Sequence, residues 1–151
     1  HIPVALRWGD MDAYGHVNNV QVHRVIEEAR VRALWQSATE ENAPTAVLGD
    51  GLTSGVQTVV ARLETEFLAT MPYSRAPIDV EVWLGRLGGA SLHLCFELYS
   101  PAGIQPRVLF VRSTTTVVTV SAETGSPVRI PEAARRAWAD YSDRAIEFTR
   151  R

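Results

Sequence analysis

The sequence predicts an α+β fold in which a five-stranded antiparallel sheet curls around one long central helix. First, a segment without glycine or proline, residues 20–37, repeats its apolar side chains at helical spacing. Second, from residue 57 onward the apolar period changes to two, which is typical of strands. Third, a helix with one apolar stripe and a sheet with one apolar face can bury each other's apolar surface.

The composition fits one domain over residues 1–151. Hydrophobic residues make up 46% of the chain and charged residues 21%. The formal net charge of −2 provides no general positive field for nucleic acid or an anionic membrane. No apolar run approaches the roughly 20 residues of a membrane span, and no signal-peptide pattern is present. We therefore expect a cytoplasmic protein without nucleic-acid or membrane partners.

The first part of the chain predicts a strand, a loop and the long helix. Residues 2–8 alternate enough for a short strand, and residues 9–17 carry turn residues with little period. Asn18 or Asn19 is a good N-cap, because an asparagine oxygen can accept a hydrogen bond from a free backbone N–H in the first turn. The helix then runs from Val20 to about Ser37. Its apolar face contains Val22, Val25, Ile26, Ala29, Ala33 and Leu34.

After a loop over about residues 39–54, two strands are expected. In residues 57–67 the odd positions from 59 are mostly apolar and the even positions from 62 are charged, which predicts a strand with one solvated face. Residues 71–77 break this pattern with two prolines. The next strand is marked by Ile78, Val80, Val82 and Leu84.

The last part of the chain predicts two further strands and a short C-terminal helix. Gly88-Gly89 supplies a tight turn before a strand marked by alternating apolar residues. A Val- and Thr-rich strand follows over Arg107 to Val120. Pro131 suits the first position of a helix that reaches Tyr141, and Arg150-Arg151 are expected to form a loose tail. In the strand that follows Gly88-Gly89, the alternating apolar residues are Leu92, Leu94, Phe96 and Leu98.

A single layer of five strands leaves sheet edges and part of the helix uncovered. Two sheets that pair edge to edge would cover both surfaces. We therefore predict a homodimer, and the pairing of dimers into a homotetramer stays open.

The segment from Arg7 to Asn19 carries the candidate chemistry. Asp12 lies a few residues before the helix start, and Gly15 between them permits a sharp reversal of the chain. The Asp12 carboxylate can therefore approach the free N–H groups of the helix N-terminus. Those groups would polarise the carbonyl of a ligand bound there. The alternative is that Asp10 and Asp12 only cap the backbone of their own turn.

Three other polar residues in this segment each allow two interpretations. His16 could be a general acid or base, or it could only shape the turn. Asn18 and Asn19 could only cap the helix, or one amide could also position a water or a substrate oxygen. These interpretations are compatible with each other.

The sequence offers little support for other chemistries. Histidines and cysteines do not occur at zinc-binding spacing, so no metal is expected. A G-x-S-x-G elbow and a Gly-rich phosphate loop with lysine are also missing. The single cysteine, Cys95, falls in an apolar strand pattern and is expected to be a buried, unreactive thiol.

The run from Arg7 to Asn19, continued by Glu27-Glu28-Ala29-Arg30, resembles the hotdog-fold acyl-CoA thioesterases of the 4-hydroxybenzoyl-CoA thioesterase type. That family shows D-x-D-x-x-G before its central helix, and here the motif continues as Gly-His-Val-Asn-Asn over Gly15 to Asn19. The order of elements predicted from periodicity agrees with the hotdog fold independently of this motif.

The resemblance implies a site as well as a fold. It places Asp12 as the catalytic general base or nucleophile, with Asp10 as a structural partner. It also implies that Gly15, His16, Val17, Asn18 and Asn19 bind the substrate, with backbone N–H groups from Val17 to Asn19 at the thioester oxygen. The implied substrate is an acyl-CoA, with acyl carrier protein thioesters as a close variant, and no cofactor is needed. The alternative is a non-catalytic acyl-CoA sensor of the same fold.

Overall fold

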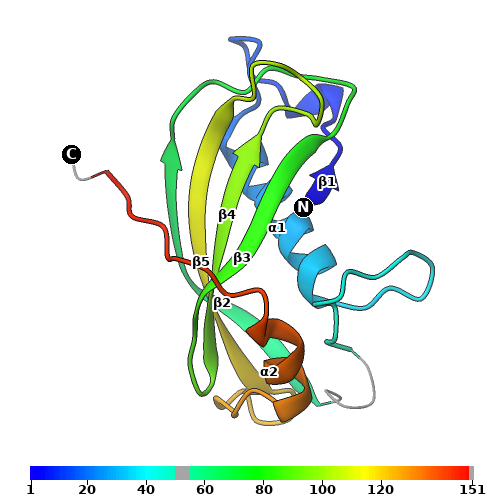
Figure 1. The fold of residues 1–151 in the computed structure, drawn as a ribbon, viewed down its shortest axis with the longest axis vertical. Helices are drawn as coiled ribbons and strands as arrows, with labels where there is room; N and C mark the ends of the chain where they lie inside the picture. The colour runs from blue at the N-terminus through cyan, green and yellow to red at the C-terminus, as the bar shows by residue number, and fades with distance from the viewer. Residues whose placement is uncertain (50–54, 150–151) are drawn as a thin grey trace.

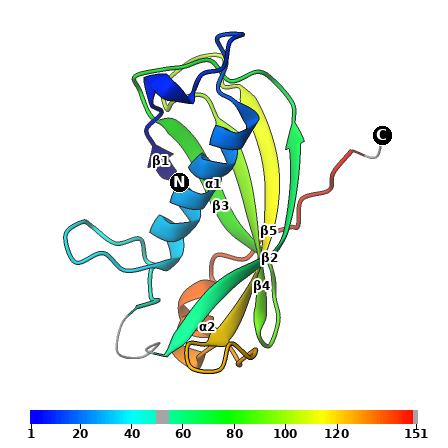
Figure 2. The ribbon, with the colours of Figure 1, turned by 180° about the vertical axis from the view of Figure 1, so that it is seen from behind.

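The computed structural model describes residues 1–49 and 55–149. A five-stranded antiparallel sheet with strand order β1-β3-β4-β5-β2 curls around the long helix α1, as Figures 1 and 2 show from opposite sides. The predicted α+β arrangement is therefore confirmed, and it is that of a hotdog fold. The end of the expected 39–54 loop and the Arg150-Arg151 tail lie outside the described residues.

The first strand is shorter than predicted. β1 covers only Ile2–Val4, and Trp8, the last residue of the predicted strand, begins a turn of 3₁₀-helix over Trp8–Asp10. The cause is Asp10, whose Oδ2 accepts a hydrogen bond from the Arg7 N–H at 2.8 Å and curls the chain. The alternation over residues 2–8 therefore misled the prediction beyond Val4.

Helix α1 (Asn19–Leu34) begins where the sequence predicts. Asn18 is the N-cap, and its Oδ1 accepts from the Val20 N–H at 2.9 Å. The helix ends three residues before the expected Ser37. There the Leu34 carbonyl accepts from the Leu48 N–H at 2.9 Å, and this pairing with the following loop extends the chain.

The four long strands are β2 (Val56–Phe67), β3 (Ile78–Leu87), β4 (Ser91–Tyr99) and β5 (Leu109–Ser121). Each prediction is confirmed to within a few residues. β3 and β4 form a hairpin through the predicted Gly88-Gly89 turn.

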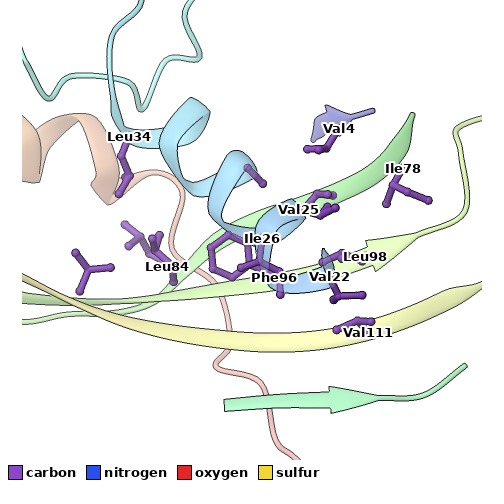
Figure 3. Close-up of a cluster of buried hydrophobic side chains, with 14 of the residues drawn as sticks. Val4, Val22, Val25, Ile26, Leu34, Ile78, Leu84, Phe96, Leu98 and Val111 are labelled. Carbon is purple, nitrogen blue, oxygen red and sulfur yellow. The ribbon is translucent and has the colours of Figure 1, made fainter. Parts of the chain in front are cut away.

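The core lies between α1 and the concave face of the sheet, and Figure 3 shows the side chains that meet there. The four apolar positions predicted for β4 all face α1 and are at most 2% exposed. The residues of the α1 stripe that meets them are at most 5% exposed. Its most buried members are Val25, Ile26 and Ala29.

β2 is an edge strand, and its apolar face is more open than predicted. A bulge after Val60 shifts the register, so Val60, Leu63 and Phe67 point to the α1 side of the sheet. These three side chains, which we call the β2 patch, remain 42%, 49% and 40% exposed. The sequence analysis expected only the charged face of this strand to contact solvent.

The C-terminal helix α2 (Glu132–Ala139) is confirmed, but Pro131 is its N-cap and not its first helical residue. The following segment runs alongside β3, where the Leu84 N–H donates to the Tyr141 carbonyl at 2.9 Å. This segment covers Cys95, which is buried as predicted, and burial raises the pKa of its thiol. Neither described helix is long and apolar enough to cross a membrane.

Candidate active site

Asp10 anchors the loop that precedes α1. Its side chain is completely buried and forms ion pairs with Arg7 at 2.9 Å and Arg24 at 2.7 Å. Burial alone would raise the pKa of Asp10, but the Arg7 N–H and both guanidinium groups outweigh it and hold the pKa below its usual range. The Asp10 carbonyl also accepts from the Asn18 N–H at 2.9 Å. Asp10 therefore connects the loop to the first two turns of the helix.

Asp12 lies at the centre of the loop and is half-buried. Its Oδ1 accepts from the N–H groups of Tyr14 at 2.9 Å and His16 at 3.4 Å. One carboxylate oxygen of Asp12 therefore caps the backbone of its own turn, as the alternative interpretation expects. In the part of the chain that the structure describes, nothing donates to Oδ2. This second oxygen is left for a ligand or a water.

A cleft of about 300 Å³ opens beside Asp12. His16, Val17 and Asn19 line it together with Asp12, so four residues of the predicted motif share one cavity. Gly15 and Asn18 do not line the cleft. Gly15 has a φ of 76° and turns the chain, and Asn18 caps α1.

The helix start presents fewer free donors than expected. The Val17 N–H donates to the Met71 carbonyl at 2.8 Å, and the Asn18 N–H donates to Asp10. Both were predicted to hold the thioester oxygen, but their bonds within the chain already occupy them. Among residues 1–49 and 55–149, no acceptor meets the Asn19 N–H. Of the three backbone N–H groups predicted to bind the thioester oxygen, the Asn19 N–H is therefore the one that remains free among the described residues.

The opposite wall of the cleft was missed by the sequence analysis. It consists of Phe67 at the end of β2 and residues 68–71 after it, together with Val111 of β5 and Val22 of α1. The signal was weak, since only the strand break at Met71-Pro72 marks this segment. Met71 also connects the two walls of the cleft, because its carbonyl accepts a hydrogen bond from the Val17 N–H.

The described residues contain no group of three or more His, Cys, Asp or Glu side chains placed to hold a metal ion. The cleft itself presents a carboxylate, an imidazole and a helix N-terminus. These groups suit attack on a polarised carbonyl.

Comparison with known proteins identifies the family of this chain. The thioesterase-like superfamily matches residues 6–138, which include the loop, α1 and the whole long-stranded sheet. The chain belongs to the thioesterase-like superfamily. This thioesterase is accordingly a thioester hydrolase by family, whereas the 4-hydroxybenzoyl-CoA type stays a prediction. No curated protein matches the chain.

Several solved structures have a fold similar to that of this thioesterase over most of its length. A Pseudomonas aeruginosa protein is 25% identical, covers 95% of this chain and 92% of its own, and has a TM-score of 0.77. A Thermus thermophilus thioesterase complexed with coenzyme A and zinc is 26% identical, with coverages of 93% and 91% and a TM-score of 0.68. A candidate acyl-CoA thioesterase from Xanthomonas campestris is 29% identical, with coverages of 83% and 93% and a TM-score of 0.60.

Proposed function

We propose that this thioesterase hydrolyses an acyl-CoA in the cleft beside Asp12. The observation that carries the proposal is that Asp12, with one unoccupied carboxylate oxygen, lines the same cleft as Asn19 at the start of α1. The coenzyme A bound to the Thermus thermophilus relative supports this class of substrate.

The proposed chemistry follows from the charge that develops during the reaction. When the thioester carbonyl carbon becomes tetrahedral, its oxygen gains negative charge. The Asn19 N–H and the positive end of the α1 dipole stabilise that oxygen. Loss of one such donor typically raises the barrier by about 3 kcal/mol. The donor is fixed in advance, because Asn18 and Asp10 hold the helix start in place.

Asp12 supplies the second half of the reaction, by one of two routes. As a general base, it removes a proton from water while the water oxygen bonds to the carbonyl carbon; the C–S bond then breaks and the thiolate takes that proton from Asp12. As a nucleophile, its free oxygen bonds to the carbonyl carbon and expels the thiolate as the C–S bond breaks, which leaves an anhydride; water then hydrolyses the anhydride to the acid and the Asp12 carboxylate, and the thiolate takes up a released proton. The geometry of Asp12 Oδ2 is compatible with both routes.

The far wall of the cleft suits the acyl group. Val22, Met71 and Val111 are all buried or nearly so and present apolar surface opposite the Asp12 loop. An acyl chain bound against this wall would be removed from water. This burial favours binding by about 25 cal/mol per Å² of apolar surface.

We also propose that the working form is a homodimer, with a homotetramer of paired dimers left open. β2 pairs only with β5 and leaves its outer edge open, and the β2 patch exposes three large apolar side chains of the same strand. Pairing of two β2 edges would cover both the open backbone and the patch. The pantetheine arm of the substrate would then lie along the seam between protomers.

The experiment is hydrolysis of a panel of acyl-CoAs, and of acyl carrier protein thioesters, with a reagent that detects released thiol. The proposal expects release by the wild type for at least one thioester, and release near background for Asp12→Asn. Calorimetry with the best substrate separates the alternatives. Tight binding without thiol release by the wild type would identify an acyl-CoA sensor and overturn the proposed hydrolysis.

A further inference from the structure

A second cavity lies at the other end of α1, away from Asp12. It has a volume of about 140 Å³, is partly open to solvent, and is lined by the C-terminal end of α1, by β1, β3 and β4, by α2 and by the loop around Thr45. It adjoins β1 and β3, at the edge of the sheet opposite β2. The proposed seam between protomers therefore does not include it.

The lining of this cavity is mostly apolar and aromatic. No Asp, Glu, Lys or Arg side chain of the described residues contributes to it, whereas Trp83, Trp138 and Tyr141 do. His1 also lines it, and its Nδ1 contacts Asp79 at 2.8 Å. Three polar groups at its wall already have partners within the chain. The Trp138 Nε1–H donates to the Thr45 carbonyl at 2.8 Å, and the Thr45 hydroxyl donates to the Ala33 carbonyl at 2.5 Å. The Trp83 Nε1–H likewise donates to the Arg144 carbonyl at 2.9 Å.

A mostly apolar lining favours an apolar molecule over water. Water in a protein cavity needs two to four polar partners, and three of the polar groups at this wall already have partners in the chain. An apolar cavity of about 150 Å³ is large enough for benzene. Aromatic walls also favour an aromatic guest, because rings pack edge to face with defined geometry.

The cavity is separate from the cleft beside Asp12. Figure 3 shows Leu34 and Leu84, which line the cavity, at one end of the core, and Val22 and Val111, which line the cleft, at the other. Val22 and Leu34 are twelve residues apart on α1, which corresponds to about 18 Å. Between them the core is filled by fully buried side chains. These include Val25, Ile26, Ala29 and Phe96.

We propose that this cavity is a second binding site, for a small uncharged aromatic molecule of about one ring. The site does not depend on the proposed hydrolysis, because it shares no lining residue with the Asp12 cleft.

The test is a ¹⁹F NMR titration of the whole protein with fluorobenzene. The wild type should give a saturable shift with a dissociation constant below about 1 mM. Ala33→Met, which places a longer side chain in the cavity, should weaken binding at least tenfold. Ala102→Met adds the same atoms at an exposed loop position and should leave binding unchanged. No saturable shift in the wild type, or equal binding by Ala33→Met, would overturn the proposal.

Two further measurements keep the test decisive. Excess CoA should not displace fluorobenzene from the wild type, because displacement would place the probe in the Asp12 cleft and refute a second site. If Ala33→Met does not fold, Leu94→Ala replaces it and enlarges the same cavity. That variant should bind 1-fluoronaphthalene, whereas the wild type should not. Equal binding of this larger ring by both proteins would contradict the assigned location.

Discussion

Replacement of Asp10 by asparagine should destabilise the fold strongly even though Asp10 does not line the cleft. The wild-type carboxylate is completely buried and accepts three hydrogen bonds, from the Arg7 N–H, the Arg7 Nε and an Arg24 nitrogen. Asparagine keeps the size of the side chain but removes its charge. Both arginines then lose their shared anionic partner.

The magnitude follows from how exposed the partners are. Removal of one member of a fully buried ion pair costs about 3–5 kcal/mol. Here the Arg7 side chain is 61% exposed and the Arg24 side chain 30% exposed, so water can partly replace the lost contacts. We therefore expect a loss of about 2–3 kcal/mol in the free energy of unfolding. For a chain of this size that corresponds to roughly 4–12 °C in Tm.

The assay is urea unfolding at one fixed protein concentration, because association would otherwise change the apparent stability. Its pH dependence separates charge from packing. The pKa of Asp10 is lowered in the folded state, so its contribution to stability is complete above the unfolded pKa of about 3.9. It is lost as the pH falls through the folded pKa. The difference between wild type and Asp10→Asn should therefore be constant near neutral pH and shrink in acid.

Asp140→Asn is the matched control, because Asp140 is an exposed residue at the end of α2. It should change stability by less than about 0.5 kcal/mol. The reasoning would be refuted if Asp10→Asn matched this control at pH 7. It would also be refuted if the destabilisation by Asp10→Asn persisted undiminished well below the folded pKa, since packing would then account for it.

Three further predictions concern the loop, the cap and the sheet edge. Gly15→Ala should lower stability by about 1–2 kcal/mol in thermal unfolding, because φ at this position is 76°, whereas Gly15→Asn should be milder. Asn18→Ala should cost about 1 kcal/mol in the same assay, because the Val20 N–H loses its acceptor, and an unchanged Tm would contradict the cap. Leu63→Arg should shift the protein from dimer to monomer in light scattering, whereas Ile104→Arg, at a similarly exposed loop position, should not. A dimer that survives Leu63→Arg would exclude the β2 patch as the interface.

The sequence predicts the helix and most strands well because their residues obey a local period. The alternation through Leu92 to Leu98 and the stripe on α1 each follow from neighbours a few positions apart, so no knowledge of the tertiary fold was needed. The predicted strand over residues 2–8 is wrong beyond Val4, because there a contact outside the local period decides the structure. A side-chain contact from Asp10 to the Arg7 backbone overrides the apolar alternation.

The candidate site could be predicted only on one side. Asp12, His16 and Asn19 are close in sequence and do share a cleft. Met71 and Val111 on the opposite wall come from segments more than fifty residues away, and nothing local in the sequence indicates which strand ends meet the loop. The pairing of Asp10 with Arg24 was missed for the same reason, because the spacing of fourteen residues acquires meaning only once the loop has folded.

The same distinction explains the amides at the helix start. The sequence shows that a helix begins after Val17, and it therefore predicts free N–H groups there. It does not show that Met71 and Asp10 supply acceptors for two of them. The number of free donors depends on tertiary contacts, and only the structure provides it.

The most direct test of the central claim is kcat/KM for the best acyl-CoA, measured for the wild type and Asp12→Asn under identical conditions. Asparagine keeps the size of the side chain and can still accept the Tyr14 hydrogen bond through its carbonyl oxygen, so the loop should stay in place. If the Asp12 carboxylate performs the attack or activates the water, kcat/KM should fall by at least about 100-fold with little change in Tm. An Asp12→Asn variant that is folded and as active as the wild type would contradict the account.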